Sequence, residues 1–475
     1  MMWFGTLFKK IFVNLFIKNY INNNSKSRAM KKLLLFPIFL LTVNGFSQDH
    51  FSGITTSKRV GILNVGMNPS ELANLNNHFE VQLFSSSINV SNNKIGFNDI
   101  IDGNNLENII FKGTEPVNFN IDTEFLGPGF AIKLLNWGFA ITSKGHIKAN
   151  IVDVDTNLGS ALTNSTLNAI GSSAIISSDK NQRINGTTWG EIGFSAAHKI
   201  FETKKHKINA GITLKLLFPG AFANIGADKF NGTITDNFGN LQLTNANANL
   251  NIAYTGSLGN EFTNTSDYTK SVFGNLQGLA TDIGVDYQLL GSGNNYKLKI
   301  GAALKNIGSM TFKSASNYST NYTLAIQGSQ QLNLNQFQNA NGVKDIEQIL
   351  LNSGFLNKTS QSTDFKVQLP TVFNLYADIK IIPKVSLTLF TQQKIKSNGG
   401  NDQITSQNII SATPRFSIGL FEAYIPVAIN EISGTTAGFG FRLGGFFLGS
   451  NSVLSALTSD GKQADFYTGF RFGFL

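Results

Sequence analysis

The feature that most constrains the fold is a repeated alternation of apolar and polar residues along the chain. In residues 207–216 every second side chain is apolar, and the positions between them are polar residues or glycine. The same alternation recurs at 282–289, 297–305 and 373–381. Successive side chains of a strand point to opposite faces, so each segment is expected to be a strand with one apolar and one polar face.

Short polar linkers separate these segments. Examples are 202–206 and 291–295, which each join two alternating runs, and 397–401, which ends another. Such linkers between alternating runs are typical of antiparallel hairpins. We expect about 14 strands between Phe79 and Phe474, many near the length that a tilted membrane strand needs.

Strands of this kind can form two architectures. A soluble sandwich or solenoid, for example a secreted adhesin, buries its apolar faces against another sheet, whereas a membrane barrel turns them toward lipid. Charged residues recur on the polar faces, which suits a water-filled lumen. We interpret residues 79–475 as an all-β, transmembrane antiparallel β-barrel of about 14 strands, with a short N-terminal helix and a helical extracellular loop.

The N-terminal region has the pattern of an export signal. Lys31 and Lys32 precede an apolar stretch at 33–43, and small residues allow cleavage between Ser47 and Gln48. We therefore expect residues 30–47 to be a Sec signal peptide that exports the chain, and the outer membrane to be its location. Residues 1–29 are interpreted as an extension from a start codon placed too early, with a membrane-surface amphipathic helix as the alternative.

Charge and cysteine usage exclude other classes of protein. The chain has a formal net charge of +9, but residues 1–47 hold seven basic residues and no acidic one, so the remainder is almost neutral. A nucleic-acid partner is therefore not expected, because binding phosphates requires clustered basic residues on the folded part. The chain has no cysteine, which excludes disulfides and thiolate metal sites.

The last twelve residues carry the most specific signal in the sequence. From Ala464 the chain alternates strictly, and it ends in the pattern of a membrane-insertion signal, formed by Tyr467, Gly469, Phe472 and Phe474. Leu475 lies one residue beyond the usual final aromatic residue. A terminal strand with an open edge can be bound by the barrel-assembly machinery through β-augmentation.

Three short motifs resemble known outer-membrane families. The element Asn68-Pro69 resembles one near the N-terminus of FadL-type fatty-acid transporters, although Ser70 stands where alanine is usual. Residues 281–287 are similar to a strand of the PorV-type barrels of Bacteroidota, and residues 442–450 resemble the penultimate hairpin of a Bacteroidota outer-membrane family of unknown function. The resemblance implies a barrel of about 14 strands. It carries over no substrate.

The segment 48–78 precedes the first expected strand. Asn68 can cap a helix, Pro69 suits its first turn, and Glu71 falls three residues after the cap. A short helix over 69–76 is expected to plug one end of the barrel, with an ordinary surface turn as the alternative.

Two long segments, 149–187 and 338–355, interrupt the strand pattern, and the second has helical spacing. Long loops of such barrels face outward, so both are expected to form an extracellular cap.

The polar faces supply the candidate functional residues. Seven charges are expected to face the lumen, where they would form ion pairs or contact a solute: Lys207, Lys215, Asp282, Asp286, Asp378, Lys380 and Arg471. The alternative is that they hydrate or brace the interior.

No catalytic chemistry is predicted. The histidines are scattered, and neither a nucleophile elbow nor a P-loop is present, so we expect no enzyme, no metal and no cofactor. Residues 153–159 place oxygen ligands at alternate positions, as calcium loops do, but the glycine lies one place late, and an acidic turn is the alternative.

These observations lead to two hypotheses of function. The first is an outer-membrane barrel that binds or passes a small molecule, with a hydrophobic one as the FadL-like candidate. The second is a barrel that transports nothing and is a scaffold for a secretion or surface-assembly partner, as PorV-type barrels are. In either case the outer face contacts outer-membrane lipid.

Overall fold

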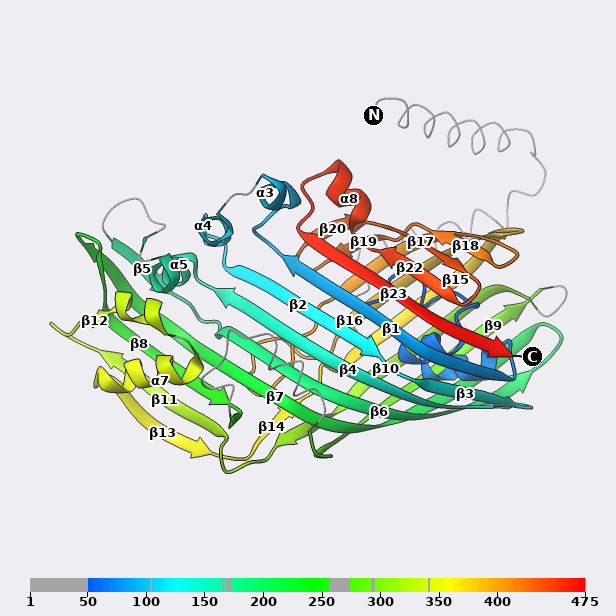
Figure 1. Ribbon diagram of the computed structural model, residues 1–475, viewed down its shortest axis with the longest axis horizontal. Helices are drawn as coiled ribbons and strands as arrows, with labels where there is room; N and C mark the ends of the chain where they lie inside the picture. The colour runs from blue at the N-terminus through cyan, green and yellow to red at the C-terminus, as the bar shows by residue number, and fades with distance from the viewer. Residues whose placement is uncertain are drawn as a thin grey trace. The chain divides into compact units, whose positions relative to one another are not determined.

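In the described part of the chain, 23 strands pair into one antiparallel sheet that closes on itself (Figure 1). The first strand, β1 (Phe79–Asn92), pairs with the last, β23 (Gln463–Phe474), and Phe79 lies opposite Phe474. The other strands are β2 (Val117–Leu126), β3 (Gly129–Leu134), β4 (Trp137–Val154), β5 (Ser173–Ser177), β6 (Gln182–Glu202), β7 (His206–Asn237), β8 (Asn240–Tyr254), β9 (Gly278–Leu290), β10 (Tyr296–Phe312), β11 (Tyr318–Ile326), β12 (Leu332–Asn333), β13 (Leu356–Ser362), β14 (Phe365–Gln368), β15 (Val372–Ile382), β16 (Val385–Lys394), β17 (Ile409–Ile418), β18 (Phe421–Tyr424), β19 (Val427–Asn430), β20 (Gly434–Ala437), β21 (Phe439–Leu443) and β22 (Phe446–Ser450).

The structure is a computed structural model that describes residues 50–102, 105–164, 166–167, 173–256, 274–291, 295–340 and 342–474. The expected start extension, the signal peptide and its cleavage site at Ser47 and Gln48 lie outside the described residues. The helices are η1 (Gly61–Gly66), η2 (Pro69–Asn74), α3 (Phe97–Ile101), α4 (Leu106–Ile110), α5 (Thr156–Asn164), η4 (Leu334–Asn339), α7 (Val343–Asn352) and α8 (Val453–Thr458). Among the described helices, none is long and apolar enough to span a membrane.

Several short strands continue one another, so the antiparallel ring has 14 positions, as expected from the sequence. Pro128 separates β2 from β3, Pro370 separates β14 from β15, and Pro426 separates β18 from β19. A proline has no N–H to donate to a neighbouring strand, which accounts for these interruptions. The ladders resume in the same order beyond each break.

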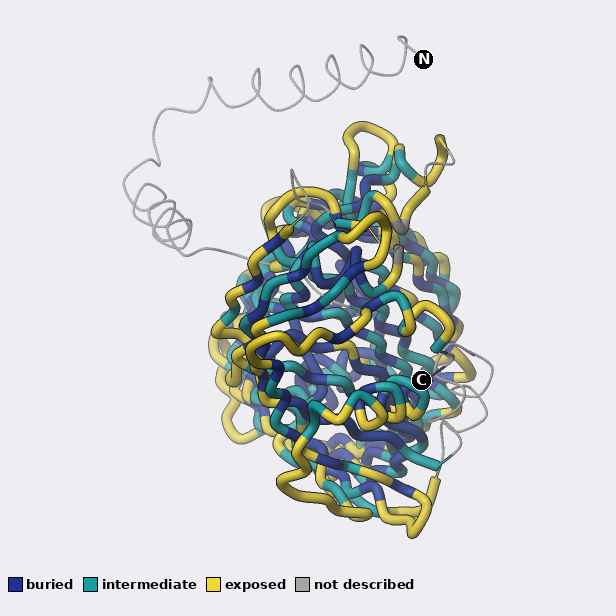
Figure 2. The backbone as a smooth tube through the Cα atoms, turned by 90° about the vertical axis from the view of Figure 1, so that its left-hand side faces the viewer, coloured by how far each residue is buried: buried dark blue, intermediate teal, exposed yellow. Residues whose placement is uncertain are grey.

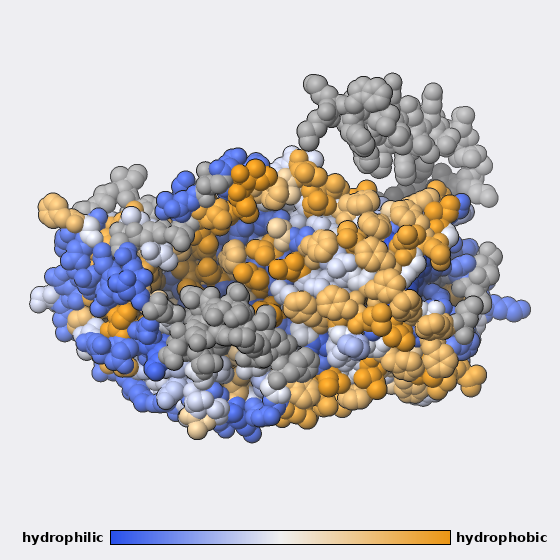
Figure 3. Space-filling view, viewed as in Figure 1, coloured by the Kyte–Doolittle hydropathy of each residue, from blue (hydrophilic) through white to orange (hydrophobic). Residues whose placement is uncertain are grey.

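Burial in the ring is the inverse of burial in a soluble sheet. On β7 and β9 the apolar Ile212 and Ile283 are 50% and 45% exposed, whereas the charged Lys215 and Asp282 are 4% and 2% exposed. On the face shown in Figure 3, apolar residues gather over the strands of the ring. A sandwich would bury these apolar faces against a second sheet, so the closed ring with its apolar outer surface confirms the barrel.

The two ends of the ring differ. Phe79 and Phe474 lie at one end, which we call the terminal end, together with short turns such as 135–136 and 383–384. The longer connections lie at the opposite, loop end: 93–116, 155–181, 395–408 and 451–462. In Figure 2, exposed residues gather at the turns, and buried residues recur along the strands between them.

One side of the wall continues past the ring at the loop end. β7 has 32 residues and β16 only 10, and the far part of β7 pairs with β5 and β8 rather than β9. We call this part, formed by β5, β8, β11, β13 and the end of β7, the extension. The helices α5, η4 and α7 pack on it around a buried apolar cluster that includes Ile234, Leu243 and Val343. On the face shown in Figure 3, hydrophilic residues gather over it.

The two segments expected to be loops are structured differently from each other. Within 338–355 the helical spacing is confirmed by α7. Within 149–187 the prediction was too broad, because β4 continues to Val154 and β6 already begins at Gln182. The connection is therefore limited to 155–181. The polar positions 144, 146, 148 and 150 extend the alternation of β4 into the segment that was assigned to the loop.

Residues 50–76, which we call the inner segment, lie inside the ring at the terminal end. The short helix expected over 69–76 is present as the 3₁₀ helix η2. Hydrogen bonds reach the inner segment from β1, β15, β17 and β23, and η2 packs on β4, β6, β7 and β9. Because these strands surround it, the inner segment is enclosed by the ring, where Figure 1 draws it in blue.

Candidate functional site

Asn68 connects the inner segment to the barrel wall. Its Oδ1 accepts hydrogen bonds from the backbone N–H of Ser70 at 3.0 Å and from the Ser70 hydroxyl at 2.8 Å, which caps η2. Its Nδ2 donates to the carbonyl oxygen of Val285 on β9 at 3.0 Å and to the Tyr376 hydroxyl on β15 at 3.3 Å. One fully buried side chain therefore begins the helix and fixes it to two strands.

Glycines in the wall make room for η2. A Cβ atom at Gly211 would lie 2.5 Å from the carbonyl carbon of Pro69, and one at Gly284 would collide with Asn68. Further along the wall, on β4, a Cβ at Gly138 would collide with the backbone of Leu72. The wall therefore lacks side chains where the helix backbone approaches it, which is a use of glycine in strands.

Glu71 forms a buried ion pair inside the barrel. Its Oε1 lies 2.7 Å from Nζ of Lys299, and both side chains are 1% exposed. The Tyr376 hydroxyl donates to the same oxygen, and Asn74 Nδ2 donates to Oε2 at 3.0 Å. Burial opposes ionisation of Glu71, but the charge of Lys299 and these hydrogen bonds outweigh it, so the pKa of Glu71 lies below its ordinary value.

The beginning of the inner segment is held on the other side of the ring. The Tyr467 hydroxyl on β23 donates to the carbonyl oxygen of Ser52 at 2.6 Å. Arg415 on β17 donates to the carbonyl oxygen of Gly53 and, at 2.9 Å, to the Thr56 hydroxyl. Polar contacts from β9, β15, β17 and β23 thus hold residues 52–71 in place.

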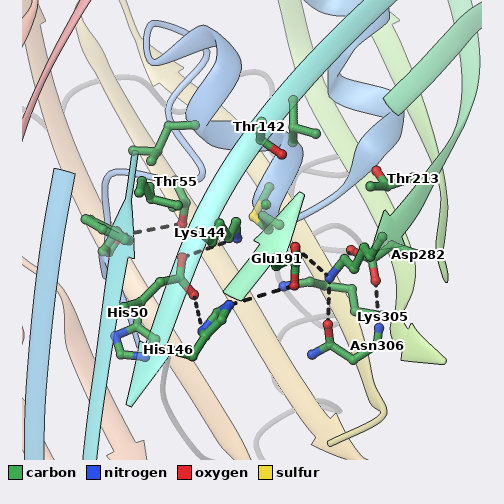
Figure 4. Close-up of a pocket in the computed structure, with 18 of the residues that line it drawn as sticks. His50, Thr55, Thr142, Lys144, His146, Glu191, Thr213, Asp282, Lys305 and Asn306 are labelled. Carbon is green, nitrogen blue, oxygen red and sulfur yellow. Dashed lines mark hydrogen bonds and ion pairs between the residues drawn. The ribbon is translucent and has the colours of Figure 1, made fainter. Parts of the chain in front are cut away.

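A cavity of about 140 Å³ lies between the inner segment and the wall; we call it the lumen cavity (Figure 4). The inner segment contributes apolar side chains, among them Phe51, Leu63 and Met67. The wall contributes charged side chains from β2, β4, β6, β7, β9 and β10: Asp122, Glu124, Lys144, His146, Lys148, Glu191, Lys215, Asp282 and Lys305. The wall also contributes apolar residues such as Trp189 and Phe390, so the lining of the lumen cavity is mixed, apolar and charged.

The charges of the wall form a connected network, part of which Figure 4 shows. His146 lies between Glu124 and Glu191, with its ring nitrogens 3.7 Å from an oxygen of each, and its ring stacks on Trp189. Nζ of Lys215 lies 2.8 Å from Asp282 and 3.6 Å from Glu191. Buried charges are tolerated when they are paired in this way.

The sequence-predicted charges occupy five different places. Lys215 and Asp282 line the lumen cavity. Lys207 and Asp286 both bind the side chain of Asn74, at the end of η2. Asp378 contacts Arg415 at 3.4 Å and accepts a hydrogen bond from Tyr296 at 2.6 Å. Arg471 lies 3.0 Å from Glu80. Lys380 is exposed near the end of β15.

The residues of the predicted insertion signal divide between the two faces of β23. Tyr467 is buried beside the inner segment, and a Cβ at Gly469 would collide with Ser85 and Phe447. Phe472 and Phe474 point outward, with 42% and 56% of their surface exposed. The strand therefore presents small and polar groups to the lumen and aromatic rings to the surroundings.

Sequence reasoning missed most of the lumen cavity. Lys144, His146 and Lys148 alternate on β4, so the rule that found Lys215 could have found them. Glu191 has no comparable signal, because its neighbours on β6 do not alternate cleanly. Of the possible calcium loop, the structure shows an acidic turn: Asp155 Oδ1 accepts the N–H groups of Asn157 and Leu158 at the start of α5.

A family model matches residues 69–451, from η2 to the end of β22. The chain belongs to the Family of unknown function (DUF5723). The matched residues include η2 and the charged wall of the lumen cavity, so both lie in the part shared with DUF5723. A search of curated proteins found no match.

Solved structures similar to this DUF5723 chain are barrels of low sequence identity. The TodX deltaS2S3 mutant monoaromatic hydrocarbon channel is 10% identical, with 90% of this chain and 97% of that chain covered and a TM-score of 0.44. The Ralstonia pickettii toluene transporter TbuX is 11% identical, with 88% and 95% covered and a TM-score of 0.39. A Pseudomonas aeruginosa FadL homologue is 8% identical, with 90% and 98% covered and a TM-score of 0.23. The function proposed below rests on the geometry of this chain.

Proposed function

We propose that this DUF5723 chain is an outer-membrane β-barrel that binds a small amphipathic molecule in the lumen cavity and lets it pass. The outer-membrane location is supported by the apolar outer surface of the ring and by the export signal expected at 30–47. In this membrane the outward side chains of the strands contact lipid, and the buried charges face the lumen.

The observation that carries the proposal is the mixed apolar and charged lining of the lumen cavity. An apolar molecule would take water away from the paired charges of the wall without replacing it, and a strongly polar one would lose its water against Phe51 and Leu63. A molecule with an apolar body and a charged group suits both kinds of side chain. Phenylalanine, which is zwitterionic at neutral pH, is a suitable probe of this class.

Trp189 supplies a direct readout of binding. It lines the lumen cavity and stacks on His146, with ring centroids 4.3 Å apart. In a Trp137→Phe background, Trp189 is the tryptophan that remains after the leader is removed. Trp189 is excited at a wavelength that phenylalanine does not absorb. We expect added phenylalanine to change the emission of Trp189 saturably. Glycine, which has no apolar body, should bind at least tenfold more weakly.

A larger side chain in the lumen cavity tests whether the probe binds there, and flux into vesicles tests whether it passes through the barrel. Leu63→Phe would occupy the lumen cavity and should abolish both the Trp189 response and the entry of phenylalanine into reconstituted vesicles. Leu214→Phe, on the outer face, adds the same atoms toward lipid and should change neither. The proposal fails if phenylalanine gives neither a Trp189 response nor flux in the unmodified barrel.

A scaffold without transport is the second candidate, and one observation favours it. The inner segment is held in the lumen by buried hydrogen bonds and by the Glu71–Lys299 ion pair, as in a permanently closed barrel. In that case vesicles would show no flux, and the barrel would co-purify with a periplasmic or surface-assembly protein. Flux of phenylalanine without such a partner would exclude the scaffold.

A further inference from the structure

A second cavity, of about 580 Å³, opens at the loop end; we call it the vestibule. Its walls come from the ends of β1, β2, β4 and β16, from the residues before β6, and from the connection 395–408. Ser406 lines both the vestibule and the lumen cavity. The connection 395–408 therefore lies between the two cavities and forms the floor of the vestibule.

The floor is built into the wall rather than left as a free loop. Arg183 of β6, which is 1% exposed, donates to the carbonyl oxygens of Gly400 and Asn398. Asn181 Nδ2 donates to the carbonyl oxygen of Gly399 at 2.9 Å, and Gln407 Nε2 donates to the Ser91 hydroxyl at 3.1 Å. A floor held by buried hydrogen bonds keeps the shape of the vestibule, as a pre-formed binding site requires.

The lining of the vestibule is rich in amides. Seven of its lining residues are asparagine or glutamine, and Phe119 is the aromatic one. Carboxylates outnumber lysines among the rest by five to two. An amide side chain both donates and accepts hydrogen bonds, and a carboxylate accepts them. The vestibule therefore presents many acceptors and several donors, beside apolar side chains such as Phe119 and Ile151.

Four of these residues carry a buried polar atom without a hydrogen-bond partner among the described residues: Asn120 Nδ2, Asn181 Oδ1, Thr405 Oγ1 and Gln407 Oε1. All four residues are at most 9% exposed. Buried polar groups of native proteins are normally satisfied. These atoms are closed off from the vestibule as placed, and a rotation of their side chains toward a ligand in it would satisfy them. One of the four is a donor and three are acceptors or can accept.

The chemistry of the lining selects one class of ligand. An apolar ligand would leave the amides unsatisfied, and an anion would be repelled by the excess of carboxylates. A simple cation could not accept a hydrogen bond from Asn120. Hydroxyl groups donate and accept in the same way as the lining does. We propose that the vestibule binds a saccharide through its amide and hydroxyl side chains.

This site is separate from the function proposed above, and its test is separate too. Sucrose is a suitable probe, and the full mature barrel is kept in lauryldimethylamine oxide because that detergent has no sugar headgroup. Saturation-transfer NMR should show saturable sucrose binding, with weaker binding of tetramethylammonium as the cation probe and of octanoate as the anion probe. The result does not depend on phenylalanine flux or on Trp189.

Two variants locate the site. Thr405→Val keeps the shape of the side chain and removes a hydroxyl that makes no hydrogen bond to the described residues, so folding should be unchanged while sucrose binds about tenfold more weakly. Gln407→Leu should have at least the same effect. Asn357→Leu, an exposed position on β13, is the matched control and should bind sucrose normally.

Three results would overturn the proposal: no saturable binding of sucrose to the folded barrel, equal binding by Thr405→Val and the unmodified chain, or preferential binding of tetramethylammonium. A band that shifts on heating in a gel shows that each variant is folded, so that loss of binding in Thr405→Val cannot be attributed to a misfolded barrel.

Discussion

Single residues decide how the inner segment is held in the barrel. Asn68 both caps η2 and donates to the wall, while Gly211 and Gly284 provide the space in which the helix lies. The charges on the polar faces were expected to contact a solute or to brace the interior, and the structure shows bracing contacts for several of them. Arg471 pairs with Glu80, and Asp378 contacts Arg415.

Replacement of Gly211 tests the fit of η2. Gly211→Val would place a side chain where the carbonyl carbon of Pro69 lies, so we expect overpacking to destabilise the docked segment by about 1–3 kcal/mol. Limited proteolysis should then cleave within 50–76 in the variant and not in the unmodified barrel. Gly461→Ala, where a Cβ meets its nearest atom at 3.5 Å, is the control. Equal protection in both variants would contradict the tight packing described here.

Acidification tests the Glu71–Lys299 ion pair. Because the pKa of Glu71 is lowered in the folded state, its contribution is present above the ordinary glutamate pKa and is lost as the pH falls through the folded value. Glu71→Gln should therefore destabilise the docked segment by about 3 kcal/mol at neutral pH, and the difference from the unmodified chain should close at strongly acidic pH. Protease cleavage within 50–76 measures this. The exposed Glu202→Gln should cost little at any pH.

At the scale of elements, β23 combines two tasks on its two faces. Its inward residues pack on the inner segment and on β22, whereas its outward phenylalanines form the end of the apolar surface. The strand also closes the ring by pairing with β1. Until β23 pairs with β1 the ring has an open edge, and we propose that an assembly factor binds this edge.

Loss of the outward rings of β23 should impair insertion. We expect the double change Phe472→Ser and Phe474→Ser to lower the amount of barrel in the outer-membrane fraction several-fold, because the barrel-assembly machinery would bind the strand less well. Phe439→Ser, on β21 and 44% exposed, removes a comparable lipid-facing ring away from the terminus. If Phe439→Ser lowers the amount of inserted barrel as much as the double change does, the aromatic residues of β23 are not a specific insertion signal.

At the scale of the whole molecule, the described ring has an apolar outer surface and charged residues on its inner face. This inversion makes detergent or lipid the natural surroundings of the ring, and it leaves the lumen filled by the inner segment and by paired charges. The extension is the exception, since its apolar residues form a core beneath α5, η4 and α7. The chain thus combines a membrane-type barrel wall with a core of the soluble type at the loop end.

A gel-shift experiment tests the closed ring. A barrel whose strands are all paired has no edge from which unfolding can begin, so the mature chain should remain folded in cold dodecyl sulfate and migrate differently after boiling. Deletion of residues 463–474 removes β23 and should abolish the shift. A mature chain that stays monomeric in water without detergent would contradict the membrane barrel.

The sequence by itself determined which side of each strand is apolar, because successive side chains of a strand point to opposite faces and the alternation can be read from neighbouring residues. It also determined the approximate number of strands, since polar linkers mark the turns. Only the tertiary structure decided which charges meet, because pairs such as Lys215–Asp282 depend on strand order and register rather than on local pattern. The same holds for the places of the inner segment and the connection 395–408: capping residues predicted η2, but the contacts with the wall that hold both segments are not visible in a local pattern.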